Sequence, residues 1–268
     1  SPNNELQGLT LAGVGSGTTI DHVQVHNSSD DGIEWFGGTV NQKNLVLTGI
    51  DDDSIDTDIG FKGAIQFAIV AQRSTGGDRI IEADSSGNEN ATPRQDTAIA
   101  NATFVSGGAA DNPDSILLRG GTDFTILNSV VTGAPVCLDI DGNATIQAAN
   151  AGLDEKGPPQ FESVFLSCPD APFRDDTDVT AAQIAQIFGA GTNNVSDGTS
   201  SLVSVFINGA NENAVTAFPA SSVRSFFEDT DYIGAVRDQN DTWWQGWTCG
   251  LGTNSPACTA APVPSTDA

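Results

Sequence analysis

The sequence predicts an all-β solenoid, a parallel β-helix closed by a C-terminal capping region with one or two short helices. Short apolar strands recur at a nearly constant offset, and Gly, Asn and Asp separate them. The composition disfavours a helical protein, because 27 of the 35 acidic residues are Asp and 29 residues are Gly. Asp, Asn and Gly prefer turns and caps, whereas Glu, Lys and Leu fill helices.

Two separate segments align with later copies of themselves when the chain is shifted by 22 residues. Val23-Gln24-Val25 falls on Leu45-Val46-Leu47 and then on Phe67-Ala68-Ile69, and residues 30–34 fall on residues 52–56. Further copies of the second segment begin at Ile81, Ile116 and Leu138, and their partner strands span 102–107, 128–133 and 164–166. Strands repeated in one chain direction are typical of coils that stack along an axis.

A β-sandwich is the alternative fold, because it also consists of short strands with turn signals. Antiparallel hairpins would place two-residue Asn-Gly or Asp-Gly loops between the strands. Within the repeats, only Asp31-Gly32 and Asp141-Gly142 fit that pattern as Asp-Gly pairs. The sequence therefore favours stacked parallel coils.

The repeat fades after about residue 170, which divides the chain into three parts. We expect coils over residues 1–170, a cap packed on them over 171–258, and a Pro- and Ala-rich tail over 259–268. Such a cap would protect the open strand edge of the last coil. Within the cap, apolar residues at helical spacing predict a helix over 177–188 and a second short one over 219–227. Residues 231–236 are predicted to form a strand.

Charge restricts the partners of the protein. Ten Lys and Arg face 35 acids, and the net charge is −25. Nucleic acid and anionic membrane are poor partners for such a surface unless a cation intervenes. Because the sequence has no run of 18 apolar residues, we also expect no direct membrane insertion.

Four cysteines, Cys137, Cys168, Cys249 and Cys258, form an even set without a metal-type CxxC pair. Two disulfides in an oxidising compartment are the favoured interpretation, and buried free thiols are the alternative. Cys249 with Cys258 would close a short loop, so that Cys137 with Cys168 follows by elimination. The chain opens at Ser1 and contains no Met. We expect a processed segment whose targeting signal has been removed, and hence a secreted or cell-surface protein.

Acidic residues form a predicted column along one outer face of the coils. Side chains alternate across a strand, so an inward Ile33 and Trp35 turn Glu34 and Phe36 outward. The same parity gives one column of Glu34, Asp56, Glu82, Leu117 and Asp139, and a second of Phe36, Asp58, Asp84, Arg119 and Asp141. At a strand spacing of about 4.8 Å, two like charges repel by roughly 0.9 kcal/mol in water and about 3.5 kcal/mol at an effective dielectric of 20.

A calcium ion between coils would relieve this repulsion, since Ca²⁺ binds carboxylate oxygens at about 2.4 Å. The best-supplied position is the turn before the acidic strands. The candidate ligands there are Asp30, Asp31, Asp51, Asp52, Asp53 and Asp78. The alternative is that these aspartates only accept hydrogen bonds from backbone amides of the turns.

Proton sharing between neighbouring carboxylates is a second way to relieve the repulsion. It would supply the acid and the base for glycoside cleavage. The candidate catalytic residues are Glu34, Asp56, Asp58 and Glu82. Solvation is the third possibility, with Arg119 pairing Asp84 or Asp141 across coils.

The stretch from Asp30 to Asn41, running into Asp52-Asp53-Ser54-Ile55-Asp56, resembles the right-handed parallel β-helix proteins of the pectate-lyase-like superfamily. It is most similar to exported bacterial β-helix proteins, often lipoproteins, of unassigned function. The resemblance implies the fold and export but no reaction. Polygalacturonases of the superfamily carry Gly-His-Gly and Arg-Ile-Lys motifs, and this sequence has only the acidic doublets.

These observations predict a secreted or cell-surface acidic scaffold, stabilised by calcium, that binds a polysaccharide, a surface protein or copies of itself. Self-association through open coil ends would give a homo-oligomer or a filament. The alternative is a glycoside hydrolase or lyase that uses the outward carboxylates.

Overall fold

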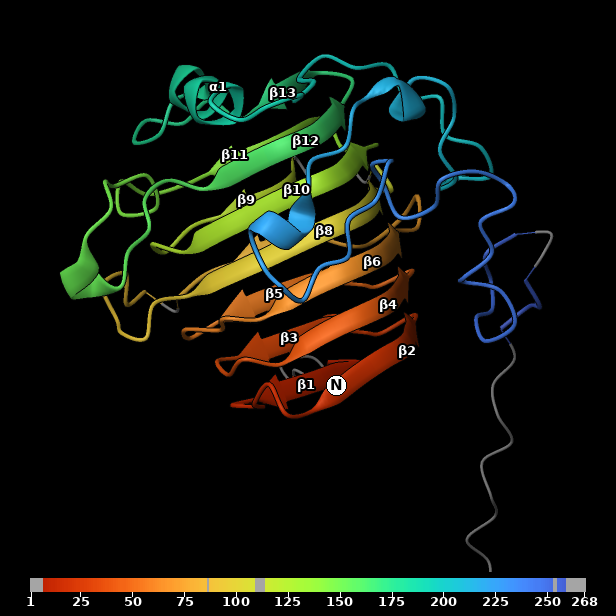
Figure 1. Cartoon of the computed structure of the whole chain (residues 1–268), viewed down its shortest axis with the longest axis horizontal. Helices are drawn as coiled ribbons and strands as arrows, with labels where there is room; N and C mark the ends of the chain where they lie inside the picture. The colour runs from red at the N-terminus through yellow and green to blue at the C-terminus, as the bar shows by residue number, and fades with distance from the viewer. Residues whose placement is uncertain (1–6, 86, 109–113, 253–254, 259–268) are drawn as a thin grey trace, which may run out of the picture.

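The computed structural model describes residues 7–85, 87–108, 114–252 and 255–258. The expected tail over 259–268 lies outside these residues. Within them, the chain winds as stacked coils that form two parallel sheets (Figure 1). All paired strands run in the same direction, as a parallel β-helix requires and a β-sandwich does not. The predicted fold class is therefore confirmed.

Short strands form a seven-stranded sheet in the order β1-β3-β5-β7-β9-β11-β13. Their bounds are Leu9–Ala12 (β1), Ile33–Phe36 (β3), Ile55–Asp58 (β5), Ile81–Ala83 (β7), Asp114–Leu118 (β9), Val136–Ile140 (β11) and Ala171–Phe173 (β13). The register places Ile33 beside Ile55 and Ile55 beside Ile81. The 22-residue repeat and its four-residue insertion before Ile81 thus correspond to neighbouring coils.

Longer strands form a six-stranded sheet in the order β2-β4-β6-β8-β10-β12. Their bounds are Thr19–His26 (β2), Asn41–Thr48 (β4), Ala64–Ala71 (β6), Asp96–Val105 (β8), Asp123–Thr132 (β10) and Gln160–Ser167 (β12). The core lies between the two sheets and includes the fully buried Trp35, Ile55 and Ile65.

Each long strand contains one residue in the left-handed backbone region. These residues are His22, Asn44, Phe67, Asn101, Asn128 and Ser163, with φ between 47° and 61°. They occupy equivalent positions on neighbouring strands, where the ladder register is interrupted. Half of them are Asn, which tolerates this conformation better than most residues. These left-handed residues bend every long strand. The strand segments on both sides of the bend therefore direct side chains into the core.

Both disulfides form as predicted. Cys137 bonds Cys168 and Cys249 bonds Cys258, and the described residues contain no free cysteine. Cys137 lies in β11 and Cys168 directly follows β12, so the first bridge joins the last two coils.

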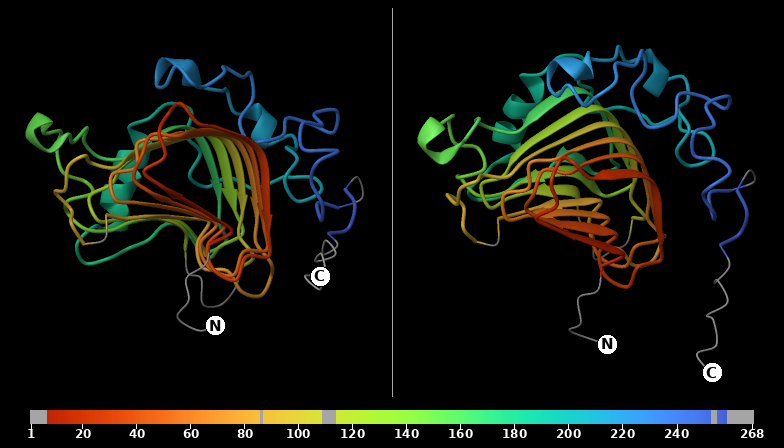
Figure 2. Two further views of the ribbon diagram at one scale, coloured as in Figure 1. Left: turned by 90° about the horizontal axis from the view of Figure 1, so that it is seen from below. Right: turned by 60° about the horizontal axis from the view of Figure 1, so that its bottom comes forward.

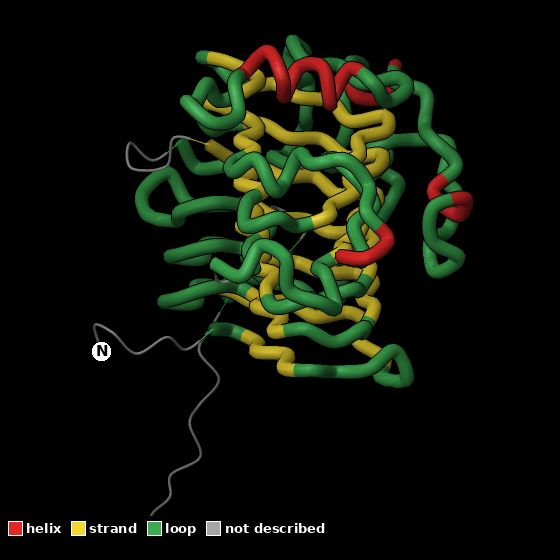
Figure 3. The backbone as a smooth tube through the Cα atoms, turned by 90° about the vertical axis from the view of Figure 1, so that its left-hand side faces the viewer, coloured by secondary structure: helices red, strands yellow, loops and turns green. Residues whose placement is uncertain are grey.

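Helix α1 (Ala181–Gly189) covers the last coil (Figure 3). Thr180 and Gln183 form a capping box at its start. Ile184 and Phe188 belong to the same core cluster as the coil interior, so this helix closes the apolar end of the solenoid. It confirms the first of the two predicted helices.

The chain then turns back as a C-terminal strap, residues 190–252, which runs over the outer face of the long-stranded sheet (Figure 2). It contacts β12 and β10 through a cluster that includes Phe165, Val130 and the strap residue Ile233. It ends beside β2, where Gln24 hydrogen-bonds Cys249. The strap therefore spans the stack from its last coil to its first.

Two elements predicted in the strap are absent from the described structure. Residues 219–227 contain only a 3₁₀ turn at Ala220–Ser222, and residues 231–236 contain no strand beyond an isolated bridge of Val236 with Ile207. The physical reason is that backbone groups of the strap bond to side chains of the sheet. Gln66 and Asn128 each form two such bonds, to Glu228 and Phe218. Peptide groups held in this way do not complete a helix or a ladder.

Candidate functional site

The acidic residues gather on the outer face of the seven-stranded sheet and at the turns that enter it. Glu34, Asp56 and Glu82 stand side by side on β3, β5 and β7. Leu117 and Asp139 continue the column on β9 and β11. In the second column, Phe36 pairs with Asp58. The outer position does not imply solvation, because Glu34, Asp58, Leu117 and Asp139 are all buried.

Carboxylate oxygens of the first three coils form three groups in which all ligand atoms lie within 4.8 Å of one another. The groups are Asp30, Asp31 and Asp52; Asp31, Glu34 and Asp56; and Asp52, Asp53 and Asp78. Asp31 and Asp52 each belong to two groups, so the three are connected. We call these seven residues the acidic cluster.

The acidic cluster contains five of the six aspartates named from the sequence as calcium ligands. The sixth, Asp51, lies outside these groups and forms an ion pair with Arg73. Glu34 and Asp56, named from the sequence as candidate catalytic residues, lie in the cluster. Glu82 and Asp58, the other two candidates, do not belong to any of its three groups.

Some of these aspartates also hold the turns together. Asp31 accepts a hydrogen bond from the Asp53 amide at 3.1 Å, and Asp53 accepts one from the Arg79 amide at 2.7 Å. Each of these bonds links one coil to the next, as the turn-bonding interpretation expects. Other oxygens are not used in this way. Among the described residues, the buried atoms Asp30 Oδ2 and Asp56 Oδ1 have no hydrogen-bond partner.

Burial and mutual repulsion raise the pKa values of the cluster. Burial, followed by the charges of Asp52 and Glu34, raises the pKa of Asp31 to about 7. Burial, followed by Asp31 and Glu34, raises the pKa of Asp56 to about 9. Burial also raises the pKa of Asp52 and, together with Glu82, that of Asp53. Without a cation, the cluster therefore retains protons near neutral pH.

Arginines pair with acids of the higher coils and with one member of the acidic cluster, Asp78. Arg79 binds Asp114 and Asp78, each at 2.8 Å. Arg119 binds Glu82 at 2.7 Å and Asp84 at 2.9 Å, which confirms the expected pairing of Arg119 with Asp84. Within the described residues, no Lys or Arg forms an ion pair with Asp30, Asp31 or Asp56. These three acids lie in the turn before β3 and on β5.

Asp139 is a residue whose environment the sequence did not reveal. It is 6 % exposed, and its Oδ1 has no hydrogen-bond partner in the described structure. Burial, followed by the charges of Asp114 and Asp176, raises its pKa to about 7. The column position was predictable, but its burial depends on packing around the last coils.

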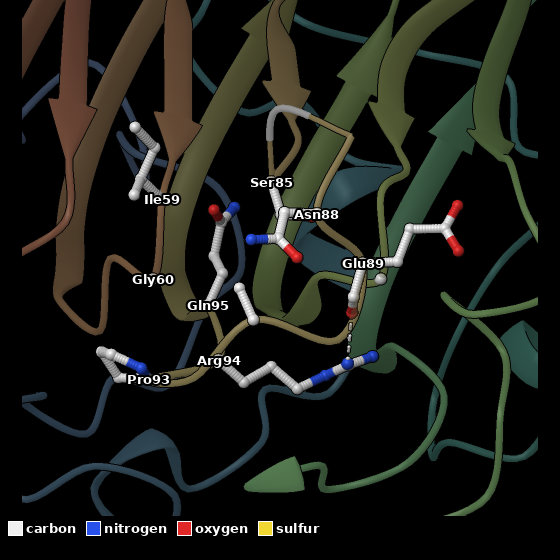
Figure 4. A pocket seen from close by; sticks show the side chains of 10 residues that line it. Ile59, Gly60, Ser85, Asn88, Glu89, Pro93, Arg94 and Gln95 are labelled. Carbon is white, nitrogen blue, oxygen red and sulfur yellow. Dashed lines mark hydrogen bonds between the residues drawn. The ribbon is translucent and has the colours of Figure 1, made fainter.

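The loop between β7 and β8 borders the same face and was also missed. Its Arg94 is 2 % exposed and pairs with Asp123 and Glu155. Figure 4 shows the adjoining cavity of about 230 Å³, with Ile59, Asn88 and Gln95 around it and Arg94 bonded to the Glu89 carbonyl. No motif signals this arrangement, because its parts come from distant coils.

Comparisons with known proteins identify one family. A family model described as a pectate-lyase like beta helix domain matches residues 1–248. No curated protein and no solved structure matches the chain. None of the helices in the described part of the chain is long and apolar enough to span a bilayer.

Proposed function

The chain belongs to the pectate-lyase-like β-helix family, and on that premise we propose that it is an exported scaffold whose first coils are joined by calcium. Its acidic face binds a polysaccharide through these ions. The observation that carries this proposal is the set of three connected carboxylate groups on β3, on β5 and on the turns before β3, β5 and β7. These groups support cation binding, whereas the sequence contains no motif of a known reaction.

The spacing of the oxygens suits calcium. Two oxygens that bind one Ca²⁺ at about 2.4 Å are separated by at most about 4.8 Å, and every group of the acidic cluster lies within 4.8 Å. Three carboxylates leave several of the six to eight calcium positions for water or for oxygens of a ligand. Partly exposed residues such as Asp52 and Asp78 keep the outer side of the cluster accessible.

Export is supported by the two disulfides, since such bonds persist in oxidising compartments. The polysaccharide is favoured over a filament of identical chains, because α1 covers the last coil. In the described structure, the outer edges of β1 and β2 are the sheet edges that remain unpaired at the first coil. Self-association through coil ends would thus give a dimer at that edge.

Calcium titration tests the proposal directly. We expect Ca²⁺ to raise the unfolding temperature of the protein prepared in EDTA, and the double variant Asp52→Asn, Asp53→Asn to lose this response. The double variant Asp170→Asn, Asp197→Asn is a matched control, because it also removes two charges, from exposed sites outside the acidic cluster. An unchanged response in the Asp52, Asp53 double variant would refute the calcium site. Calcium-dependent retention on a glycan array then tests the polysaccharide.

A glycoside hydrolase is the second candidate, favoured by the raised pKa of Asp56. A protonated Asp56 could act as the acid, and Glu82 on the adjacent strand could act as the nucleophile. Glu82→Gln tests this assignment, since it removes the nucleophile and leaves the three carboxylate groups themselves intact. Loss of sugar release with an unchanged calcium response would establish catalysis; unchanged release would exclude this assignment.

A further inference from the structure

A second cavity, of about 600 Å³, lies on the other sheet, away from the outer face that bears the acidic column. The ends of β2, β4 and β6 form one wall, through His26, Thr48 and Ala71. The strap forms the other wall, through residues 204–206 and 250–252. A volume of this size accommodates a small organic molecule.

The strap gives the cavity an apolar wall built around Val205. Its neighbours in the wall, Phe206 and Leu251, are 1 % and 7 % exposed, whereas Val205 is 56 % exposed. A large apolar side chain is thus held in solvent at the cavity.

The backbone at Val205 is in an unfavourable conformation. Val205 has φ of 79° and the preceding Ser204 has φ of 50°, in the turn that joins the bridged residues Val203 and Ile207. Turns with two such residues normally contain Asn and Gly. A β-branched residue in this region is an outlier, and such outliers are concentrated at binding sites. The turn therefore keeps the apolar side chain of Val205 at the cavity although the backbone conformation of Val205 is unfavourable.

The sheet gives the cavity a polar wall that can bind an anion. Asn27 Nδ2 lies 3.0 Å from His26 Nε2, and Thr48 Oγ1 lies 2.7 Å from His26 Nδ1. In the tautomer in which His26 Nε2 accepts from Asn27 Nδ2, Nδ1 donates to Thr48, and the Thr48 hydroxyl hydrogen is then available. Arg73 pairs with Asp51, and its guanidinium has five N–H groups, more than one carboxylate uses.

The charge of the cavity differs from that of the rest of the protein. The net charge of the chain is −25, yet none of the described residues that line the cavity is Asp or Glu, and Arg73 is among them. We propose that the cavity binds a small molecule with a flat apolar ring system and one anionic group. The ring lies against Val205, Phe206 and Leu251, and the anion binds Arg73 and the Thr48 hydroxyl.

Two fluorescent probes with related ring systems test this site. Anilinonaphthalene sulfonate carries an anion, whereas N-phenyl-1-naphthylamine is neutral. We expect the sulfonate to bind the whole protein at one site and about tenfold more tightly than the amine. Arg73→Gln should remove this difference between the probes, while binding of the neutral amine stays within about twofold of its wild-type value.

Paired substitutions locate the site. Val205→Asp should weaken sulfonate binding by about tenfold or more. Val203→Asp is the matched control, because it introduces the same charge at another exposed valine. Val203 is 40 % exposed and does not line the cavity. The proposal is overturned if the sulfonate does not saturate, if the two Asp variants behave alike, or if Arg73→Gln leaves the preference for the anion intact.

Discussion

At the scale of single residues, the acidic cluster determines how stability depends on pH. The pKa of Asp31 is raised to about 7 and that of Asp56 to about 9 in the folded protein, from 3.8 in both cases. Between the unfolded and folded pKa values, the folded state binds more protons than the unfolded state. Stability is therefore lost as the pH rises through this range.

The first prediction concerns this loss of stability with rising pH. In EDTA, the free energy of unfolding should fall between pH 5 and pH 7, by up to about 1.4 kcal/mol per pH unit for each of these two carboxyls, and Asp56 alone should extend the fall toward pH 9. Saturating calcium should abolish or reverse the slope, because the ion takes the place of the protons. Urea unfolding at several pH values, with and without calcium, measures both slopes. A metal-free protein that gains stability with rising pH would contradict the cluster as described.

At the scale of elements, carboxamide side chains fasten the strap to the sheet. Gln66 donates to the Glu228 carbonyl at 2.7 Å and accepts from the Glu228 amide at 2.9 Å. Gln24 and Asn128 bind Cys249 and Phe218 in the same two-sided manner. An amide side chain matches a peptide group because each has one donor face and one acceptor face. The backbone hydrogen-bonding groups of the strap at these positions thus find partners without forming a strand.

The second prediction concerns Gln66. Gln66→Ala should lower the free energy of unfolding by about 1–3 kcal/mol, because it leaves the Glu228 N–H and C=O without these partners. Urea unfolding measures the loss, and hydrogen exchange should show faster exchange around Glu228. Gln160→Ala is the matched control, since Gln160 is an exposed residue of β12 in the same sheet. Equal losses in the two variants would show that the side-chain bonds do not fasten the strap.

The same elements show how far sequence reasoning reaches. The repeat of Ile33, Ile55 and Ile81 and the acidic column followed from a constant offset, because stacking converts sequence spacing into vertical register. The strap could not be predicted in this way. Its contacts join residues as distant as Gln24 and Cys249. The available signal was the apolar character of outward residues such as Val46 and Ile69, which the strap covers.

The candidate site was predictable in its position but not in its energetics. Asp30, Asp31, Asp52 and Asp53 were identified from acidic doublets at one offset and Asp78 from the third coil, and the structure brings them together. The pairing of Asp51 with Arg73 was not foreseen, because Arg73 lies in the turn of another coil. The burial of Asp31 and Asp139 likewise depends on neighbouring coils and not on local sequence.

At the scale of the whole molecule, the two ends of the solenoid are stabilised by different means. Coils contact only their neighbours, so each end of such a stack can open separately. At the last coils, α1 covers the core and Cys137 is bonded to Cys168. At the first coils, the acidic cluster repels itself unless a cation is bound. The metal-free protein should therefore open from β1 and β3.

The third prediction separates the two ends. Replacing Cys137 and Cys168 by Ser should cost about 3–4 kcal/mol, as expected for a bridge across 31 residues. Hydrogen exchange should then increase over β12, β13 and α1, whereas EDTA should increase it over β1 and β3. The Cys249, Cys258 double Ser variant is the control, because that bridge spans 9 residues at the end of the strap. If chelation and loss of the Cys137–Cys168 bridge exposed the same strands, the coils would unfold as one unit. Calcium would then not stabilise the first coils locally.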